Sequence, residues 1–303
     1  MMKRLLTYIF LLSGAGLLNA QQLPHFSQYM LNDYAENCAV AGKNPYIEAS
    51  SINRYQWFGI TDAPRTYLLS VDGGLKNPHF GVGGQIFTDI TGPSRRTGCY
   101  LSYAYHAKIT KDIKLSLGVQ GGILQYMVDG SQIILHDQGD LVMSNGLQSV
   151  LMPEFGFGAY VYNKDIWYVG FSIPEIVENK LKFFDYMAST QSVIQRHYTL
   201  MGGYKYPINE LFTIQPTFIA RYVDPVPVQF DIGVRVIYRN KIWIGGSYRN
   251  LDAIVGLIGY TFRENITIGY AYDFATTNIQ NYSTGSHELF VSLRFNRPPA
   301  KNP

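Results

Sequence analysis

Ile266–Phe274, with the sequence ITIGYAYDF, sets the pattern for the whole chain. Every second residue in it is large and apolar, and the residues between are Thr, Gly, Ala and Asp. Leu289–Phe295 (LFVSLRF) repeats the pattern, with Phe290 as the exception. An alternation with a period of two predicts a β-strand that has one apolar face and one polar face. A long final strand that ends on an aromatic residue, here Phe295, is typical of outer-membrane barrels.

The same alternation recurs along most of the chain and is clearest in Val228–Val236 (VQFDIGVRV). About fourteen strands are predicted, and bacterial single-chain barrels have an even number of strands. The predicted fold class is therefore all-β, a transmembrane antiparallel β-barrel of the outer-membrane type with about 14 strands. The predicted strands are residues 46–57, 65–71, 80–88, 101–108, 113–120, 155–161, 167–173, 196–206, 212–221 and 228–236, followed by four that begin near Lys241, Asp252, Glu264 and Ser286.

Connections between these strands alternate in length. The turns near residues 76, 111, 164, 208, 240 and 264 are short, and those near 60, 92, 140, 185, 225, 250 and 280 are mostly longer. Residues 92–96, 224–227, 130–148 and 175–194 are predicted as loops. Membrane barrels have short periplasmic turns and longer outer loops. This alternation predicts that both ends of the chain lie on the periplasmic side.

Composition supports the same class. Aromatic residues make up 15% of the chain and charged residues only 16%, against roughly 25% in soluble domains. The mean hydropathy of −0.05 fits a wall in which only alternate residues face lipid. The formal net charge of +3 gives no support to a nucleic-acid partner. A soluble β-sandwich or propeller is the alternative, but many predicted strands approach the roughly ten residues that a tilted membrane strand needs.

Four segments are predicted along the chain. Residues 1–20 have the charged start, apolar run and small final residue of a signal peptide. Residues 21–45 form an N-terminal periplasmic or plug segment, 46–296 the outer-membrane β-barrel and 297–303 a C-terminal tail. Residues 21–45 carry apolar side chains without a long strand or helix period. We expect these side chains to be covered by the barrel lumen or by a periplasmic partner.

No catalytic, cofactor-binding or metal-binding residues are predicted. His136-Asp137-Gln138-Gly139-Asp140 could ligate a cation, but an ordinary solvated loop is favoured. Asp231, Arg235, Glu288 and Arg294 are predicted to face inward, where pairing with neighbouring charges is favoured over a polar pathway. His287-Glu288 invites a catalytic interpretation but has no positioned Ser or Asp partner. A disulfide between Cys38 and Cys99 is formally possible and is not favoured, because the two residues fall near opposite ends of the barrel.

Several segments resemble the PorP/SprF family, in order and spacing, over essentially all of residues 21–296. The segments are Phe26-Ser27-Gln28-Tyr29-Met30-Leu31-Asn32, Asn37-Cys38-Ala39-Val40-Ala41-Gly42, Arg54-Tyr55-Gln56-Trp57, Gly59, Ala63-Pro64, Gly246-Ser247-Tyr248-Arg249, Gly269-Tyr270-Ala271-Tyr272-Asp273 and Gly285-Ser286-His287-Glu288-Leu289. Cys38 stands where the family usually has Pro.

The resemblance implies an outer-membrane component of the type IX secretion system of Bacteroidetes, linked in some members to gliding motility. It implies no enzymatic activity and no cofactor. The implied partners are periplasmic ring lipoproteins and a peptidoglycan-binding lipoprotein, or a secreted adhesin with a C-terminal sorting domain. Membrane lipid surrounds such a protein, and nucleic acid is not among its partners.

Two other function classes remain open from the sequence. A barrel of about fourteen strands is wide enough for a narrow channel, so a small-solute porin or transporter is the main alternative. A barrel enzyme or a soluble β-protein is the other. The predicted inward positions of 156–162 are Gly and Tyr in place of the charged rings that selective pores use. This composition favours a lumen packed by side chains or by a peptide.

Overall fold

The computed structural model describes residues 24–133, 146–164, 166–181 and 192–296 of the chain. Strands dominate the described part, and nearly all of them belong to one antiparallel sheet. The strands of this sheet are β1 (Ile47–Tyr55), β2 (Arg65–Gly74), β3 (Phe80–Thr91), β4 (Ser94–Lys108), β5 (Ile113–Asp129), β6 (Leu147–Asn163), β7 (Trp167–Ile173), β10 (His197–Tyr204), β11 (Tyr206–Pro207), β12 (Phe212–Val223), β13 (Val226–Tyr238), β14 (Ile242–Arg249), β15 (Ala253–Phe262), β16 (Ile266–Ala275) and β17 (Ser286–Phe295).

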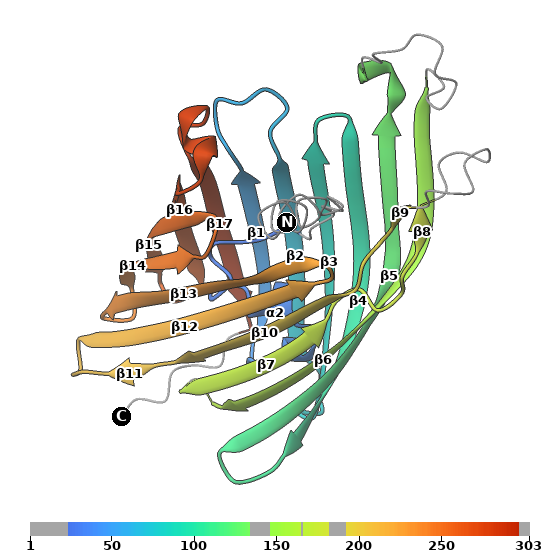
Figure 1. Cartoon of the computed structure of the whole chain (residues 1–303). Helices are drawn as coiled ribbons and strands as arrows, with labels where there is room; N and C mark the ends of the chain where they lie inside the picture. The colour runs from blue at the N-terminus through green and yellow to red at the C-terminus, as the bar shows by residue number, and fades with distance from the viewer. Residues whose placement is uncertain (1–23, 134–145, 165, 182–191, 297–303) are drawn as a thin grey trace, which may run out of the picture.

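The sheet closes on itself (Figure 1). The first and last strands pair from Ile47↔Phe295 to Tyr55↔His287, and β10 pairs with both β7 and β12. The short β11 continues β10 after a one-residue break, so the closed wall has fourteen strands. The predicted antiparallel barrel is confirmed, and closure leaves each wall strand with a partner on both sides.

The wall is apolar outside and polar inside. Alternate residues with large exposed apolar side chains include Leu101 on β4, Val119 on β5, Ile232 on β13 and Ile268 on β16, which are between 49% and 72% exposed. The residues between them are buried and mostly small or polar. This arrangement is the reverse of a soluble protein and matches the alternation of a transmembrane barrel. Among the described residues, no helix is both long and apolar enough to cross a bilayer.

The two ends of the barrel differ in their connections. At one end, which we call the short-turn end, every hairpin closes within a few residues, as at residues 109–112 and 239–241. The long-loop end carries residues 56–64, 130–133, 174–181, 192–196 and 276–285. It also holds the helical turns η2 (Gly130–Gln132) and η3 (Asn278–Asn281) and the two-stranded pair β8 (Lys180–Leu181) and β9 (Ser192–Val193).

Some predicted boundaries were wrong at the long-loop end. Residues 94–96 and 226–227 were predicted as loop, but they begin β4 and β13, so only Gly92–Pro93 and Asp224–Pro225 remain as turns. The predicted loop 175–194 contains β8 and β9. β5 and β6 run for 17 residues each: β5 continues to Asp129, past its predicted end at 120, and β6 begins at Leu147, before its predicted start at 155 and inside the predicted loop 130–148. At the start of β4, the polar residues Ser94, Arg95 and Arg96 concealed the alternation.

The N-terminal segment of the described chain lies inside the ring of strands (Figure 1). It contains α2 (Asp33–Glu36) and η1 (Cys38–Val40). Three clusters of buried apolar residues fill the lumen, and each includes residues from this segment, for example Phe26, Tyr29 and Tyr34. The core of the protein is therefore formed jointly by the wall and the segment that the wall encloses.

Candidate functional site

The candidate site is the lumen, with the segment that occupies it. We call residues 24–46 the plug. Its fold is set by two asparagines: the Asn32 side chain accepts a hydrogen bond from the Ala35 N–H at 3.3 Å and caps α2, and the Asn37 side chain accepts from the Ala39 N–H at 2.9 Å and caps η1. Asn is a favoured residue at helix N-caps because its side chain satisfies a free N–H. These local bonds keep a short chain folded without a long helix.

Glycines in the wall make room for the plug. A Cβ atom on Gly118 of β5 would lie 2.5 Å from the Ala39 Cα, and one on Gly83 of β3 would lie 2.6 Å from the Tyr34 ring. A Cβ on Gly158 of β6 would collide with the Asn37 side chain. Glycine in a strand interior often marks the close approach of another backbone. Part of the high glycine content of the sequence therefore serves to seat the plug.

Polar contacts join the plug to strands on several sides of the barrel. The Tyr34 hydroxyl lies 3.0 Å from the Ser102 hydroxyl on β4, and the Tyr29 hydroxyl donates to Thr217 on β12 at 3.1 Å. The Ser172 hydroxyl of β7 donates to the Glu36 carbonyl at 2.7 Å. Because these bonds reach different parts of the wall, the plug is attached to several strands and not to one strand alone.

A buried cluster of charges near the long-loop end also attaches the plug to the wall. We call it the Ser27 cluster. Its members are Ser27 and Gln28 of the plug, Arg54 (β1), Asp231 (β13), Arg249 (β14), Asp252, Asp273 (β16) and Glu288 (β17).

Two carboxylates of the cluster bind the plug directly. The Ser27 and Gln28 N–H groups donate to the two oxygens of Glu288 at 2.8 and 2.9 Å, and the Ser27 hydroxyl donates to Asp273 at 2.8 Å. Arg54 and Arg249 each donate to the Ser27 oxygen at 2.9 Å. The Ser27 hydroxyl therefore sits between two guanidinium groups and a carboxylate.

The same arginines form ion pairs with the carboxylates. Arg54 lies 2.7 Å from Asp273 and 3.1 Å from Glu288, and Arg249 lies 3.0 Å from Asp231 and 3.1 Å from Asp273. The two arginine side chains are no more than 1% exposed. Buried ion pairs of this kind contribute little net stability, but removing one partner leaves an uncompensated charge and costs about 3–5 kcal/mol. The cluster therefore makes the position of the plug specific.

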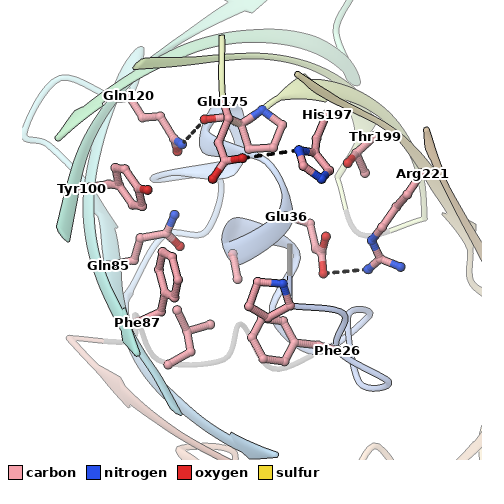
Figure 2. Close-up of a pocket in the computed structure, with 14 residues that line it drawn as sticks. Phe26, Glu36, Gln85, Phe87, Tyr100, Gln120, Glu175, His197, Thr199 and Arg221 are labelled. Carbon is pink, nitrogen blue, oxygen red and sulfur yellow. Dashed lines mark hydrogen bonds and ion pairs between the residues drawn. The ribbon is translucent and has the colours of Figure 1, made fainter. Parts of the chain in front are cut away.

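A small cavity lies beside the plug on the long-loop side (Figure 2). Glu36 of α2 points toward Arg221 of β12, and the two lie 2.9 Å apart. Across the cavity, Glu175 lies 3.0 Å from Arg96 and 3.3 Å from His197. The cavity has a volume of about 70 Å³, room for a few waters only. Its charged groups already have partners, so it is part of the packing between plug and wall.

The four inward residues singled out from the sequence all face the lumen, and the preferred interpretation, pairing with neighbouring charges, is confirmed for Asp231, Glu288 and Arg294. Asp231 and Glu288 belong to the Ser27 cluster. Arg294 lies 3.1 Å from Glu48, and Arg235 donates to the Gln215 side-chain oxygen at 2.9 and 2.7 Å. The partner of Arg235 is thus an amide and not a charged group.

His287 and Glu288 lie on opposite faces of the wall, because neighbouring residues of a strand point in opposite directions. The His287 ring faces outward, with its Nδ1 atom 2.7 Å from the Tyr270 hydroxyl, while Glu288 is buried in the lumen. They do not form a pair. His136 to Asp140 lie outside the described residues. Within the described residues, no group of three acidic, His or Cys side chains is placed to hold a metal ion.

The two cysteines are free thiols on opposite sides of the wall. Cys38 is buried in the plug, and Cys99 of β4 faces outward. Burial raises the pKa of the Cys38 thiol to about 12, so it stays protonated at neutral pH and reacts slowly. A bridge between the two would require the chain to pass through the wall.

Sequence reasoning missed most of the cluster, although signals were present. The alternation in 266–274 places Asp273 inward, but an inward carboxylate alone does not identify its partner. Arg54 lies more than 200 residues from Asp273 and Glu288, and Ser27 lies more than 200 residues from Arg249, Asp273 and Glu288. Six members of the cluster (Ser27, Gln28, Arg54, Arg249, Asp273 and Glu288) fall in the segments that carry the family resemblance. This overlap was the signal in the sequence that could have pointed to the cluster.

The closed wall, its lipid-facing apolar band and its filled lumen define a plugged transmembrane β-barrel of the outer-membrane type. A family model described as "Type IX secretion system membrane protein PorP/SprF" matches residues 18–293. The chain belongs to this family. A search of curated proteins found no significant match.

Solved barrel structures resemble the chain at low identity. The translocator domain of the autotransporter NalP from Neisseria meningitidis has 8% identity and a TM-score of 0.48, covering 89% of this chain and 94% of that one. The Acinetobacter baumannii outer membrane protein Omp33 has 11% identity and a TM-score of 0.47, covering 84% and 100%. A Pseudomonas aeruginosa FadL homologue has 12% identity and a TM-score of 0.45, covering 82% and 88%. The family assignment rests on the family model alone.

Proposed function

We propose that this protein is an exported outer-membrane component of the type IX secretion or gliding machinery, and that it supports the secretion or surface anchoring of adhesins. In this role it binds other proteins and catalyses no reaction. Its partners are periplasmic lipoproteins of the machinery or an adhesin with a C-terminal sorting domain. The family match supports the secretion system, and the short turns support a periplasmic position for the short-turn end.

The plug is the observation that favours this role over a solute channel. A porin needs a water-filled lumen, but here the plug side chains from Phe26 to Met30 are buried within the barrel and bonded to its wall. A barrel whose lumen is occupied by its own chain presents a fixed platform to partners at both ends. Scaffold and anchor functions need such a platform, whereas diffusion of solutes does not.

Crosslinking in cells followed by affinity purification tests this proposal. We expect a tagged protein to recover secretion-system lipoproteins or one large surface protein. Recovery of neither, together with steady single-channel conductance of the purified protein in lipid bilayers, would instead establish a porin.

Deletion of residues 22–36 tests the role of the plug in closing the lumen. We expect the barrel to assemble and its conductance, or the sensitivity of cells to detergents, to rise. If permeability is unchanged but lipoproteins no longer copurify, the segment acts as a docking arm and not as a seal.

A further inference from the structure

A second cavity opens at the short-turn end, and it is much larger than the one beside Glu36. Its volume is about 560 Å³, against about 70 Å³ for the cavity of Figure 2. Pockets that bind small molecules or a few residues of a peptide span about 300–1,000 Å³. The cavity lies where the plug leaves the lumen, between residues 42–47 and the turns that contain Pro78, Lys111 and Lys164.

Lysines dominate the charge of this cavity. We call it the basic mouth and define it by Lys43 of the plug, Lys111, Lys114 of β5 and Lys164. Among the described residues of the lining, Asp112 is the one acidic residue; it lies 2.7 Å from Lys164, and both side chains are well exposed. Lys43 is paired with Asp33 of the plug. Lys111 and Lys114 make no ion pair in the described part of the chain.

An adjoining cavity on the other side of the plug exit extends the positive charge. It shares Lys43 and Lys164 with the basic mouth and adds Lys205, Arg235 and Arg294. Among the described residues, seven basic ones line the two cavities against three acidic ones, Asp33, Glu48 and Asp112. The sign of the potential at this end is therefore positive, and a low-dielectric wall concentrates it in the opening.

The position of the lysines favours a water-soluble partner over lipid headgroups. Lys114 follows the inward alternation of β5, since Ser116 and Gly118 beyond it are buried, and its ammonium lies 6.0 Å from the centre of the inward Tyr162 ring. These groups surround the opening of the lumen and not the outer belt of the barrel. A headgroup in the surrounding bilayer contacts the outer face, whereas a chain entering from the periplasm meets these lysines first.

We infer that the basic mouth binds a short carboxylate-rich segment of a periplasmic protein. The inference rests on the proposed function, which sets the orientation of the barrel with its short-turn end facing the periplasm. Lysine ammonium groups attract carboxylates as point charges, and the cavity admits a few extended residues. The plug exit forms one side of the mouth, so a segment bound there contacts the plug as well as the wall.

Binding of a labelled hexaglutamate peptide to the full-length protein in uncharged detergent tests this inference. The test variant is Lys111→Gln with Lys114→Gln. The matched control is Arg239→Gln with Lys241→Gln, which removes the same charge from the turn between β13 and β14, away from the mouth. We expect the test variant to bind about tenfold more weakly, the control to change little, and added salt to weaken wild-type binding.

Three results would overturn the inference: equal loss in the test and control variants, equal binding of hexaglutamine, or displacement of the peptide by micelles containing phosphatidylglycerol, which would assign the mouth to headgroups. Crosslinking from position 111 in cells supplies the second readout. Capture of a periplasmic protein through an acidic segment supports the inference. Failure to bind hexaglutamate while secretion-system proteins still copurify rejects the site and leaves the proposed function standing.

Discussion

The Ser27 cluster and the basic mouth lie at opposite ends of the same plug and use charge in opposite ways. In the cluster, two arginines face four carboxylates, and almost every group is buried and hydrogen-bonded. In the mouth, Lys43 pairs with Asp33 and Lys164 with Asp112, Lys111 and Lys164 are exposed, and Lys111 and Lys114 make no ion pair among the described residues. Paired, buried charge fixes one arrangement of the chain, whereas unpaired, solvated charge remains available to a partner.

This difference assigns two roles to the two ends of one lumen: the cluster holds the plug in place, and the mouth is open to a partner. A substitution in the cluster should lower the free energy of unfolding strongly, because removing one member leaves its partner as a buried, unpaired charge. A substitution in the mouth should change the free energy of unfolding little, because water can solvate a charge that loses its partner there. The free-energy cost of a substitution should therefore fall from the long-loop end to the short-turn end.

Arg54→Met should cost the most. Asp273 and Glu288 would keep their burial and lose a cation, so we expect the free energy of unfolding to fall by about 3–5 kcal/mol. Urea unfolding of the refolded protein measures this. In a Cys99→Ser background, Cys38 should also become reactive to maleimide as the plug loosens. Arg65→Met is the control: Arg65 is exposed on the neighbouring strand, opposite Tyr55, and its loss should cost less than about 0.5 kcal/mol. Equal costs would contradict the cluster.

Ile232 and Asp231 compare the two faces of one strand. Ile232→Arg places a charge on the lipid face and should cost about 2–4 kcal/mol if the residue lies near the bilayer centre. From the sequence alone, Asp231→Asn is expected to cost much less. Its 3.0 Å contact with Arg249 changes this expectation to about 1–3 kcal/mol, the cost of weakening a buried charged hydrogen bond. Asp231→Asn should also raise Cys38 labelling, whereas Ile232→Arg should leave labelling of the folded protein unchanged.

Gly118→Ala tests the close contact between the plug and β5, which lies between the two charged regions. The added Cβ would meet the Ala39 backbone at 2.5 Å, and overpacking of this kind costs about 1–3 kcal/mol. Gly121→Ala on the same strand is matched to it, because its Cβ would make only ordinary contact, at 3.5 Å, with Phe155. Faster labelling of Cys38 in the first variant and not in the second is the expected result. Identical behaviour would show that the plug does not press on β5.

Lys164→Met should cost least. The Lys164–Asp112 pair is 69% and 47% exposed, and exposed pairs contribute about 0–1 kcal/mol. We expect unfolding curves that nearly superpose on those of the wild type. A loss as large as that of Arg54→Met would mean that the mouth, too, holds the fold together, and the distinction between the two regions would disappear.

The strand pattern was readable from the sequence because the wall of a membrane barrel is a repeated local rule. β13 shows the rule most plainly: its outward residues are apolar and its inward residues are Gln, Asp, Gly and Arg. Errors occurred where the rule weakens, as at Ser94-Arg95-Arg96, where polar residues continue a strand beyond the apolar band. The resemblance to the family likewise depended on short local segments and was confirmed by the family model.

By itself, then, the sequence determined the fold class, the approximate strand number, the faces of most strands and the family, because each depends on neighbouring residues along the chain. Only the tertiary structure decided where residues 24–46 lie, since neither strand nor helix periodicity describes them. It also decided that Ser27 meets Arg54, Arg249, Asp273 and Glu288 at one point. Closure of the barrel brings the first and last strands together, and no local signal reports a contact between groups more than 200 residues apart.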